Sequence, residues 1–393
     1  MNTEPPRPRA TIPASVAWKP GDPVGDRQFF SFADERPFVL EHGGSLRSIT
    51  IAYETWGTLD DDCSNAILVC HALTGDSHAT GDMGPAHPTP GWWSDFIGPG
   101  KALDTDRFFV VCANVLGGCQ GSTGPASLDP RSGQPYGSSF PVVTIRDIVR
   151  TQARLADSLG IDTWYQVIGG SMGGMQVLEW AIMFPDRLRS ITCLAATLGA
   201  TAQQIAWSAL GRNALVLDPK WRGGNYYHAV PGDGPHAGLA AARGVAQVTY
   251  RTDEVFQQRF AREPADSLDG FGLWGQFQVE SYLDHHGIKL ARRFDANSYL
   301  ILNRAMDLHD VGRGRNGYLN AVKRIKVPSL VVSISSDALY FPWQQEELVA
   351  ALKATDQVCH YEVVQSRQGH DGFLLESDLI SPRVAKFLAD IAF

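Results

Sequence analysis

Short apolar runs alternate along this chain with longer stretches whose apolar residues recur at helical spacing. The runs predict strands at residues 65–70, 107–112, 164–168, 189–194, 328–334 and 358–364, the first two of them buried on both faces. The periodic stretches predict helices at residues 145–159, 171–184, 344–352 and 381–391, the first closed by Gly160 and the second by Pro185. Residues 49–53 are expected to pair with residues 38–40 in an early antiparallel hairpin.

The order of these elements predicts an α/β fold, because strands that alternate with helices form a mainly parallel sheet with helices on both faces. The alternation stops at residues 196–324, which are predicted to be mostly helical. We expect this stretch to be a cap, or lid, inserted over the carboxyl edge of the sheet, where ligands of such folds bind. The core would then consist of residues 26–195 and 325–393, preceded by a flexible arm at residues 1–25.

Composition narrows the possible partners. The formal net charge is −8 and no run of Lys or Arg occurs, so a nucleic-acid surface is not expected. The arm is rich in Pro and Arg and contains no apolar stretch of the length needed for a secretory signal or a membrane span. Six cysteines without CxxC spacing indicate reduced thiols, and we expect a cytoplasmic location.

Ser171 is the candidate nucleophile, in the turn Gly169-Gly170-Ser171-Met172-Gly173. A GxSxG match is weak alone, but here a predicted apolar strand leads into the turn and a predicted helix leads out. That arrangement forces a serine into a strained turn with its hydroxyl accessible, as in the α/β-hydrolase fold. Side chains at Gly169 and Gly173 are expected to collide with neighbouring elements. A Gly-rich turn that merely connects the two elements is the alternative interpretation.

A serine nucleophile needs a base and a carboxylate that orients the base, in the chain order Ser, Asp or Glu, His. His370 follows the last predicted strand and Asp337 follows the one before it, so both lie at carboxyl ends. His360 falls within a strand, and Asp356 precedes one and would lie at the opposite edge. The predicted triad is therefore Ser171, Asp337 and His370, with ordinary loop roles for Asp337 and His370 as the alternative.

Two backbone N–H groups are expected to form the oxyanion hole, those of Met172 and of Leu73 in the loop after the strand at residues 65–70. No metal site is predicted: His71 and His78 are not accompanied by carboxylates or thiolates at the spacing of ligands.

Several longer motifs occur in a fixed order from about residue 30 to the end of the chain. They are YETWG (53–57), HALTGDSH (71–78), PGWW (90–93), GPG (98–100), NVLGGC (114–119), GSTGP (121–125), GGSMGG (169–174), ESYL (280–283), RFDA (293–296), HDVGR (309–313) and GHDGF (369–373). Together they resemble the homoserine O-acetyltransferase family of methionine biosynthesis. The resemblance implies a ping-pong acyl transfer through an acyl-serine, with acetyl-CoA as co-substrate, no bound cofactor and L-homoserine as acceptor. It also implies a homodimer formed through the cap.

The resemblance assigns the two charged ends of the acceptor to Arg243, for the carboxylate, and Asp371, for the ammonium group, with Tyr250 near the same pocket. A guanidinium fork suits a carboxylate, and a carboxylate suits an ammonium ion. Two departures from the family pattern fall in this region: Gln247 stands where the family usually has His, and residues 220–227 keep only part of the usual motif.

Alternatives within the same mechanism are succinyl-CoA as donor and L-serine as acceptor, although LTGDS (73–77) resembles the acetyl-using members. An ester hydrolase of the same fold, in which water replaces the acceptor, is a further alternative. A catalytically inactive binding protein would have to retain all three triad residue types by accident.

Overall fold

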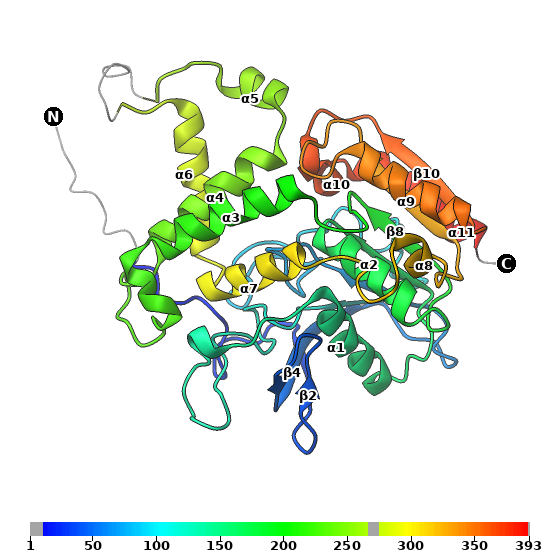
Figure 1. Cartoon of the computed structure of the whole chain (residues 1–393), viewed down its shortest axis with the longest axis horizontal. Coiled ribbons are helices and arrows are strands. Elements are labelled where there is room, and N and C mark those ends of the chain that lie inside the picture. The colour runs from blue at the N-terminus through cyan, green and yellow to red at the C-terminus, as the bar shows by residue number, and fades with distance from the viewer. Residues whose placement is uncertain (1–10, 266–274, 392–393) are drawn as a thin grey trace.

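The computed structural model describes residues 11–265 and 275–391, and its centre is one eight-stranded sheet (Figure 1). The strand order is β1 (Gln28–Phe32), β4 (Ile49–Trp56), β6 (Phe109–Ala113), β5 (Ala66–Cys70), β7 (Gln166–Gly170), β8 (Ile191–Leu194), β9 (Ser329–Ile334), β10 (Cys359–Val364). Strands β5 to β10 are mutually parallel, whereas β4 runs antiparallel to both of its neighbours, β1 and β6. The predicted fold class, a mainly parallel sheet flanked by helices, is confirmed.

Both faces of the sheet are buried at its central strands, whereas the edge strands β1 and β10 are partly exposed. Alternate residues of β5 point to opposite faces, so that Leu68 packs with helices α1 (Ile145–Ser158), α2 (Met172–Met183) and α9 (Pro342–Ala354). Ile67 packs on the other face, with α11 (Ser377–Asp390) and the segment around Phe96. Every residue of β5, β7, β8 and β9 is buried. Because these strands are parallel, their carboxyl ends share one edge, and the residues that follow them are brought together there.

The predicted early hairpin is wrong. Strand β4 pairs with β1, while Phe38 and Val39 form β2 and pair with β3 (Ser45–Leu46). The reason lies in Gly43 and Gly44, whose φ angles of +89° and +77° allow a tight reversal directly after β2. The last helix also begins earlier than predicted, at Ser377, and contains Pro382.

Between β8 and β9 the chain is mostly helical over its described residues. The helices are α3 (Ala202–Val216), η2 (Pro219–Gly224), α4 (His236–Tyr250), α5 (Asp253–Phe260), α6 (Gln278–Ala291), α7 (Ala296–Asp307) and α8 (Tyr318–Val322). Helices α3, α4 and α6 lie together to one side of the sheet and its flanking helices (Figure 1). The division into core and cap remains a prediction. None of the helices in the described part of the chain is long and apolar enough to cross a membrane.

The chain leaves the sheet and returns to it at adjacent points. The N–H of Ala200 donates to the carbonyl of His309 at 2.9 Å, and the N–H of Val311 donates to that of Leu198 at 2.9 Å. Residues 198–200 and 309–311 therefore form a short pair of antiparallel segments at the base of the helical insertion.

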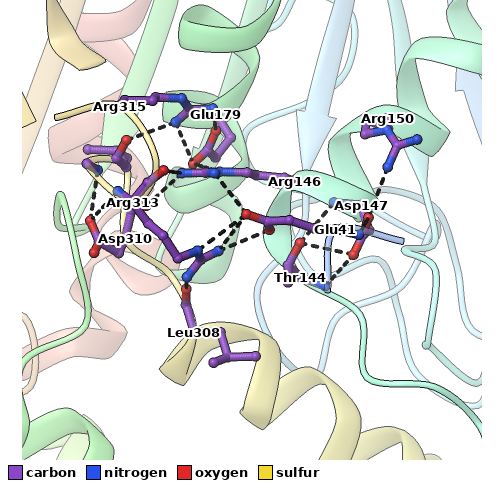
Figure 2. A network of polar contacts seen from close by, with 12 residues as sticks. Glu41, Thr144, Arg146, Asp147, Arg150, Glu179, Leu308, Asp310, Arg313 and Arg315 are labelled. Atoms are coloured by element: carbon purple, nitrogen blue, oxygen red, sulfur yellow. Dashed lines mark hydrogen bonds and ion pairs between the residues drawn. The ribbon is translucent and has the colours of Figure 1, made fainter. Parts of the chain in front are cut away.

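A network of ion pairs fastens the returning segment to α2 (Figure 2). The Glu179 carboxylate, on α2, accepts from Arg146 Nε at 2.9 Å and from Arg315 at 2.7 Å. Arg146 also contacts Glu41 at 2.8 Å and donates to the backbone carbonyls of residues 310 and 313 at 2.9 Å each. Glu179 is 1% exposed, so removal of one partner would leave a buried charge uncompensated. The network holds the return of the insertion against the helix that begins at Met172.

Candidate active site

Ser171 occupies the sharp turn between β7 and α2. Its backbone has φ +57° and ψ −123°, an unfavourable region for any residue other than Gly, and its N–H donates to the carbonyl of Leu194 at 3.0 Å. The neighbouring glycines have no room for side chains: a Cβ at Gly169 would lie 2.6 Å from the carbonyl oxygen of Cys70, and one at Gly173 would lie closer still. As predicted, side chains at Gly169 and Gly173 would collide with neighbouring elements, so only glycine fits at these two positions of the tight turn.

Ser171, His370 and Asp337 form one hydrogen-bonded chain, although they come from three separate segments. His370 Nε2 lies 2.9 Å from Ser171 Oγ, and His370 Nδ1 lies 2.7 Å from Asp337 Oδ2. Asp337 follows β9, and His370 follows β10 in the short 3-10 helix η3 (Gly369–Asp371). All three side chains are buried. The arrangement allows His370 to take a proton from Ser171 while Asp337 holds the imidazole in place.

Tyr340 supports this chain and was not singled out from the sequence. Its backbone N–H donates to Asp337 Oδ1 at 2.8 Å, and that of Leu339 donates to the same oxygen at 2.9 Å. The Tyr340 ring stacks on the His370 ring, with centroids 4.8 Å apart and planes at 23°. One oxygen of Asp337 is therefore held by backbone amides while the other faces His370, and the aromatic ring limits how His370 can turn.

The two amides predicted for the oxyanion hole lie in elements that one side chain connects. Met172 is the first residue of α2, so its N–H has no acceptor within the helix, and Leu73 lies in the loop after β5. From α2, Gln176 Nε2 donates to the carbonyl of His71 and to that of Met172, at 3.1 Å each. This amide ties the loop of Leu73 to the helix of Met172.

His71 fixes the same loop from within. Its Nδ1 donates to the carbonyl of Ala72 at 2.8 Å, and its Nε2 accepts from the N–H of Val115 at 3.1 Å. These partners require one neutral tautomer, and burial lowers the pKa of His71, which keeps the ring neutral.

A cavity of about 460 Å³ is lined by both residues assigned to the acceptor, Arg243 and Asp371, and Asp371 directly follows His370 in the chain. Its wall also includes Ala72, next in the chain to Leu73. The Arg243 guanidinium lies over the Tyr250 ring, 5.1 Å from its centroid, and that ring is 5.9 Å from the ring of His370. The structure thus brings Arg243, Asp371 and Tyr250 together near His370. Larger depressions, of about 720 and 680 Å³, lie elsewhere on the protein.

Asp371 has a partner that the sequence did not reveal. Its Oδ2 lies 3.2 Å from Nε of Arg251, and Arg251 also donates to Gln368 Oε1 at 2.8 Å. Burial raises the pKa of Asp371, while the positive charges of Arg251 and Arg243 act in the opposite direction. Arg251 directly follows α4 in the chain, and only the fold places it against the loop that carries His370.

Arg293 also lines the cavity, and the sequence assigned it no role. It donates to the carbonyl of Thr74 at 2.6 Å, and its burial lowers the pKa of the guanidinium although Asp76 lies nearby. Its motif, RFDA, was part of the family resemblance, but no role followed from it. Gln247, one of the departures from the family pattern, is buried on α4 and donates to the hydroxyl of Tyr282 at 2.8 Å.

Glu54, His78 and His87 form a buried cluster whose ligand atoms lie within 4.8 Å of one another. Glu54 accepts from Ser77 Oγ and from His78 Nδ1, at 2.8 Å each. The two imidazole rings are stacked, 3.7 Å apart and 9° from parallel, so their lone pairs lie in parallel planes and do not converge on one ion. Burial opposes protonation of His78, but the Glu54 carboxylate raises its pKa, as expected for a buried ion pair. We therefore interpret the cluster as a support for the loop at residues 73–78.

Comparison with known proteins agrees with this architecture. The alpha/beta hydrolase fold family matches residues 65–377. The chain is 52% identical to the homoserine O-acetyltransferase of Thermobifida fusca (strain YX) over 378 residues, which cover 96% of this chain and 98% of that protein. A crystal structure of homoserine O-acetyltransferase from Bacillus anthracis superposes with a TM-score of 0.85 at 26% identity, covering 92% of this chain and 97% of that one. The crystal structure of esterase E22 superposes with a TM-score of 0.84 at 29% identity, covering 92% of this chain and 99% of that one.

The fold and the hydrogen-bonded Ser-His-Asp chain define an alpha/beta hydrolase. Within that class, the chain belongs to the homoserine O-acetyltransferase family.

Proposed function

We propose that this enzyme transfers an acetyl group from acetyl-CoA to the hydroxyl of L-homoserine, which yields O-acetyl-L-homoserine and CoA. The observation that carries the proposal is the hydrogen-bonded series of side chains Asp337, His370 and Ser171, in a protein of this family. His370 lies 2.7 Å from Asp337 and 2.9 Å from Ser171.

In the first half-reaction Ser171 Oγ attacks the thioester carbonyl while His370 Nε2 takes its proton. The oxyanion of the tetrahedral intermediate accepts hydrogen bonds from the N–H groups of Leu73 and Met172. The carbon–sulfur bond then breaks, His370 returns its proton to the thiolate of CoA, and an acetyl ester remains on Ser171.

In the second half-reaction the homoserine hydroxyl loses its proton to His370 and attacks the acetyl carbonyl. Collapse of the intermediate releases Ser171, which takes the proton back from His370. Arg243 holds the carboxylate of homoserine, and Asp371 holds the ammonium group in exchange for part of its contact with Arg251. Because Tyr250 lies between Arg243 and His370, it helps to place the acceptor over the ester.

Ester hydrolysis is the second candidate, favoured by the likeness to esterase E22, which matches this chain at a TM-score of 0.84. A matrix of donors and acceptors separates the two candidates. Acetyl-, succinyl- and propionyl-CoA are each combined with homoserine, serine or water, and thiol release is followed. Acetyl transfer predicts fast turnover for acetyl-CoA with homoserine and slow turnover with water, whereas hydrolysis predicts equal rates with and without an amino acid.

We further infer a homodimer formed through the cap and a cytoplasmic location. Helix α3 and the residue after it expose Leu210 and Leu217, which are 54% and 80% accessible and would be covered by a partner subunit. All six cysteines are free, which suits a reducing compartment. Sedimentation equilibrium tests the dimer: Leu210→Arg combined with Leu217→Arg is expected to give a monomer, and an unchanged mass would contradict the interface.

A further inference from the structure

Basic residues gather on α6 and directly after it. Lys289, Arg292 and Arg293 are positively charged, and His285 and His286 lie beside them. A second cavity, of about 450 Å³, adjoins the acceptor pocket and shares Thr89, Lys289 and Arg293 with it. The two cavities together lead from Asp371, beside His370, outward along α6, which packs against α4 (Figure 1).

This positive charge is not neutralised locally. No carboxylate of a described residue lines the outer cavity, and neither Lys289 nor Arg292 forms an ion pair within residues 11–265 and 275–391. The two carboxylates of the inner cavity are already engaged, because Asp76 accepts from the N–H of His78 at 2.9 Å and Asp371 contacts Arg251. In a chain with a net charge of −8, such a local excess of cations requires an explanation.

The lowered pKa of the neighbouring His286 is consistent with a positive electrostatic potential at this site. Burial and then the charges of Arg243, His285 and Lys289 lower its pKa to about 4, so it remains neutral while the groups around it are positive. A single carboxylate, such as that of the acceptor, is matched by Arg243 alone and leaves the outer cations without a counter-charge.

We propose that Lys289 and Arg292, assisted by His285, bind the phosphate groups of the acyl-CoA donor. The inference rests on the proposed function, which supplies a CoA thioester as donor. In such a molecule the pantetheine arm separates the thioester from several phosphate charges, so the groups that recognise the two ends must lie at opposite ends of one channel. Asp371 lies in the inner cavity and directly follows His370, which contacts Ser171 Oγ at 2.9 Å. Lys289 and Arg292 line the outer cavity, where their ammonium and guanidinium groups suit phosphate oxygens.

Charge reversal tests the proposal. Lys289→Glu and Arg292→Glu, singly and together, are compared with Lys353→Glu, an exposed lysine on α9, a helix of the sheet's flank that lies away from α6 (Figure 1). The double variant is expected to raise KM for acetyl-CoA about tenfold or more, with a smaller effect on kcat, since each exposed charge contact contributes modestly and reversal adds repulsion. The increase is expected with acetyl-CoA and not with S-acetylpantetheine, a donor without phosphates, and Lys353→Glu should resemble the wild type. An unchanged KM for acetyl-CoA, or an equal increase for both donors, would overturn the assignment.

A binding measurement separates this proposal from the proposed reaction. Adenosine 3′,5′-bisphosphate carries phosphates of the donor but no acyl group, and its binding is measured by calorimetry without turnover. Weaker binding to the double variant than to the wild type and to Lys353→Glu supports the phosphate site, even if no transfer to homoserine is found. Equal binding to all three proteins refutes it, whatever the acceptor proves to be.

Discussion

Gln176 donates from its amide nitrogen to the backbone carbonyl of His71 at 3.1 Å, which joins the helix that follows Ser171 to the loop that carries Leu73. The same nitrogen donates to the carbonyl of Met172, and Gln176 Oε1 accepts from Gln152 at 2.7 Å. The distance between the amides of Leu73 and Met172, the two proposed oxyanion donors, thus depends on the side chain of Gln176. Gln176 is a positioning residue in our account.

Gln176→Leu is therefore expected to slow acylation of Ser171 by roughly 10-fold, since full loss of one oxyanion donor costs about 10²–10³. Stopped-flow release of CoA from acetyl-CoA measures this step. Gln152→Leu is the matched control, because it removes the same buried contact without freeing the His71 loop, and it should lower stability with a smaller effect on acylation. Equal rate losses in both variants would show that Gln176 acts through stability alone.

Asp337→Asn tests how the base is oriented. The substitution keeps the shape of the side chain but places an amide where Oδ2 accepts from His370, so the imidazole loses the partner that fixes its tautomer. We expect kcat to fall about 10³- to 10⁴-fold with little change in the free energy of unfolding. A fall of less than tenfold would mean that Asp337 is not the orienting carboxylate.

Arg243→Ala should separate the two half-reactions. Loss of a charge-assisted contact to the acceptor carboxylate is expected to raise KM for homoserine roughly 10- to 100-fold, from a typical 1.5–3 kcal/mol for such a bond. The initial burst of CoA from acetyl-CoA should remain, since Arg243 takes no part in acylation. Disappearance of the burst would contradict the proposal that Arg243 binds the carboxylate of the acceptor.

The Glu179 network makes a prediction about stability. Glu179→Gln leaves Arg146 and Arg315, which are 14% and 8% exposed, without their shared carboxylate. We expect a loss of about 3 kcal/mol in the free energy of unfolding, measured by urea denaturation. Glu362→Gln, which breaks the half-exposed pair with Arg383, is the control and should cost less than about 1 kcal/mol. If the two variants are equally stable, the network does not fasten the returning segment to α2.

His71 makes stability depend on pH. Its pKa is lowered in the folded protein, so unfolding takes up a proton once the pH falls below the unfolded value of about 6.5. The stabilisation is present above that value and is lost as the pH falls from there toward the folded pKa. For the wild type we expect a steeper loss of unfolding free energy below pH 6.5 than for His71→Gln, by up to about 1.4 kcal/mol per pH unit. His360→Gln, at an exposed position of β10, is the control, and identical slopes in all three proteins would refute the role of His71.

The sequence predicted those parts of the site that depend on strand order. Ser171, Asp337 and His370 each follow a recognisable apolar strand, and parallel strands bring their carboxyl ends to one edge whatever the details of packing. The contacts that could not be predicted connect segments with no such rule. Arg251 reaches Asp371, and Arg293 reaches Thr74, because segments of the insertion between β8 and β9 lie against the loops that follow β10 and β5.

The same limit explains the wrong hairpin. Residues 38–39 and 49–53 are both apolar enough to pair, and the pattern alone did not show that Gly43 and Gly44 would reverse the chain first. The role of Gln176 could not be predicted either, because the sequence does not indicate which backbone carbonyls a buried Gln on an apolar helix will contact.

The most direct test of the account is rapid-quench analysis of the enzyme mixed with acetyl-CoA in the absence of an acceptor. We expect a burst of about one CoA per active site, an acetyl group on Ser171 detected by mass spectrometry, and then very slow release that homoserine accelerates. Fast, steady release of CoA without homoserine, or an acetyl group that homoserine does not remove, would contradict acetyl transfer through Ser171.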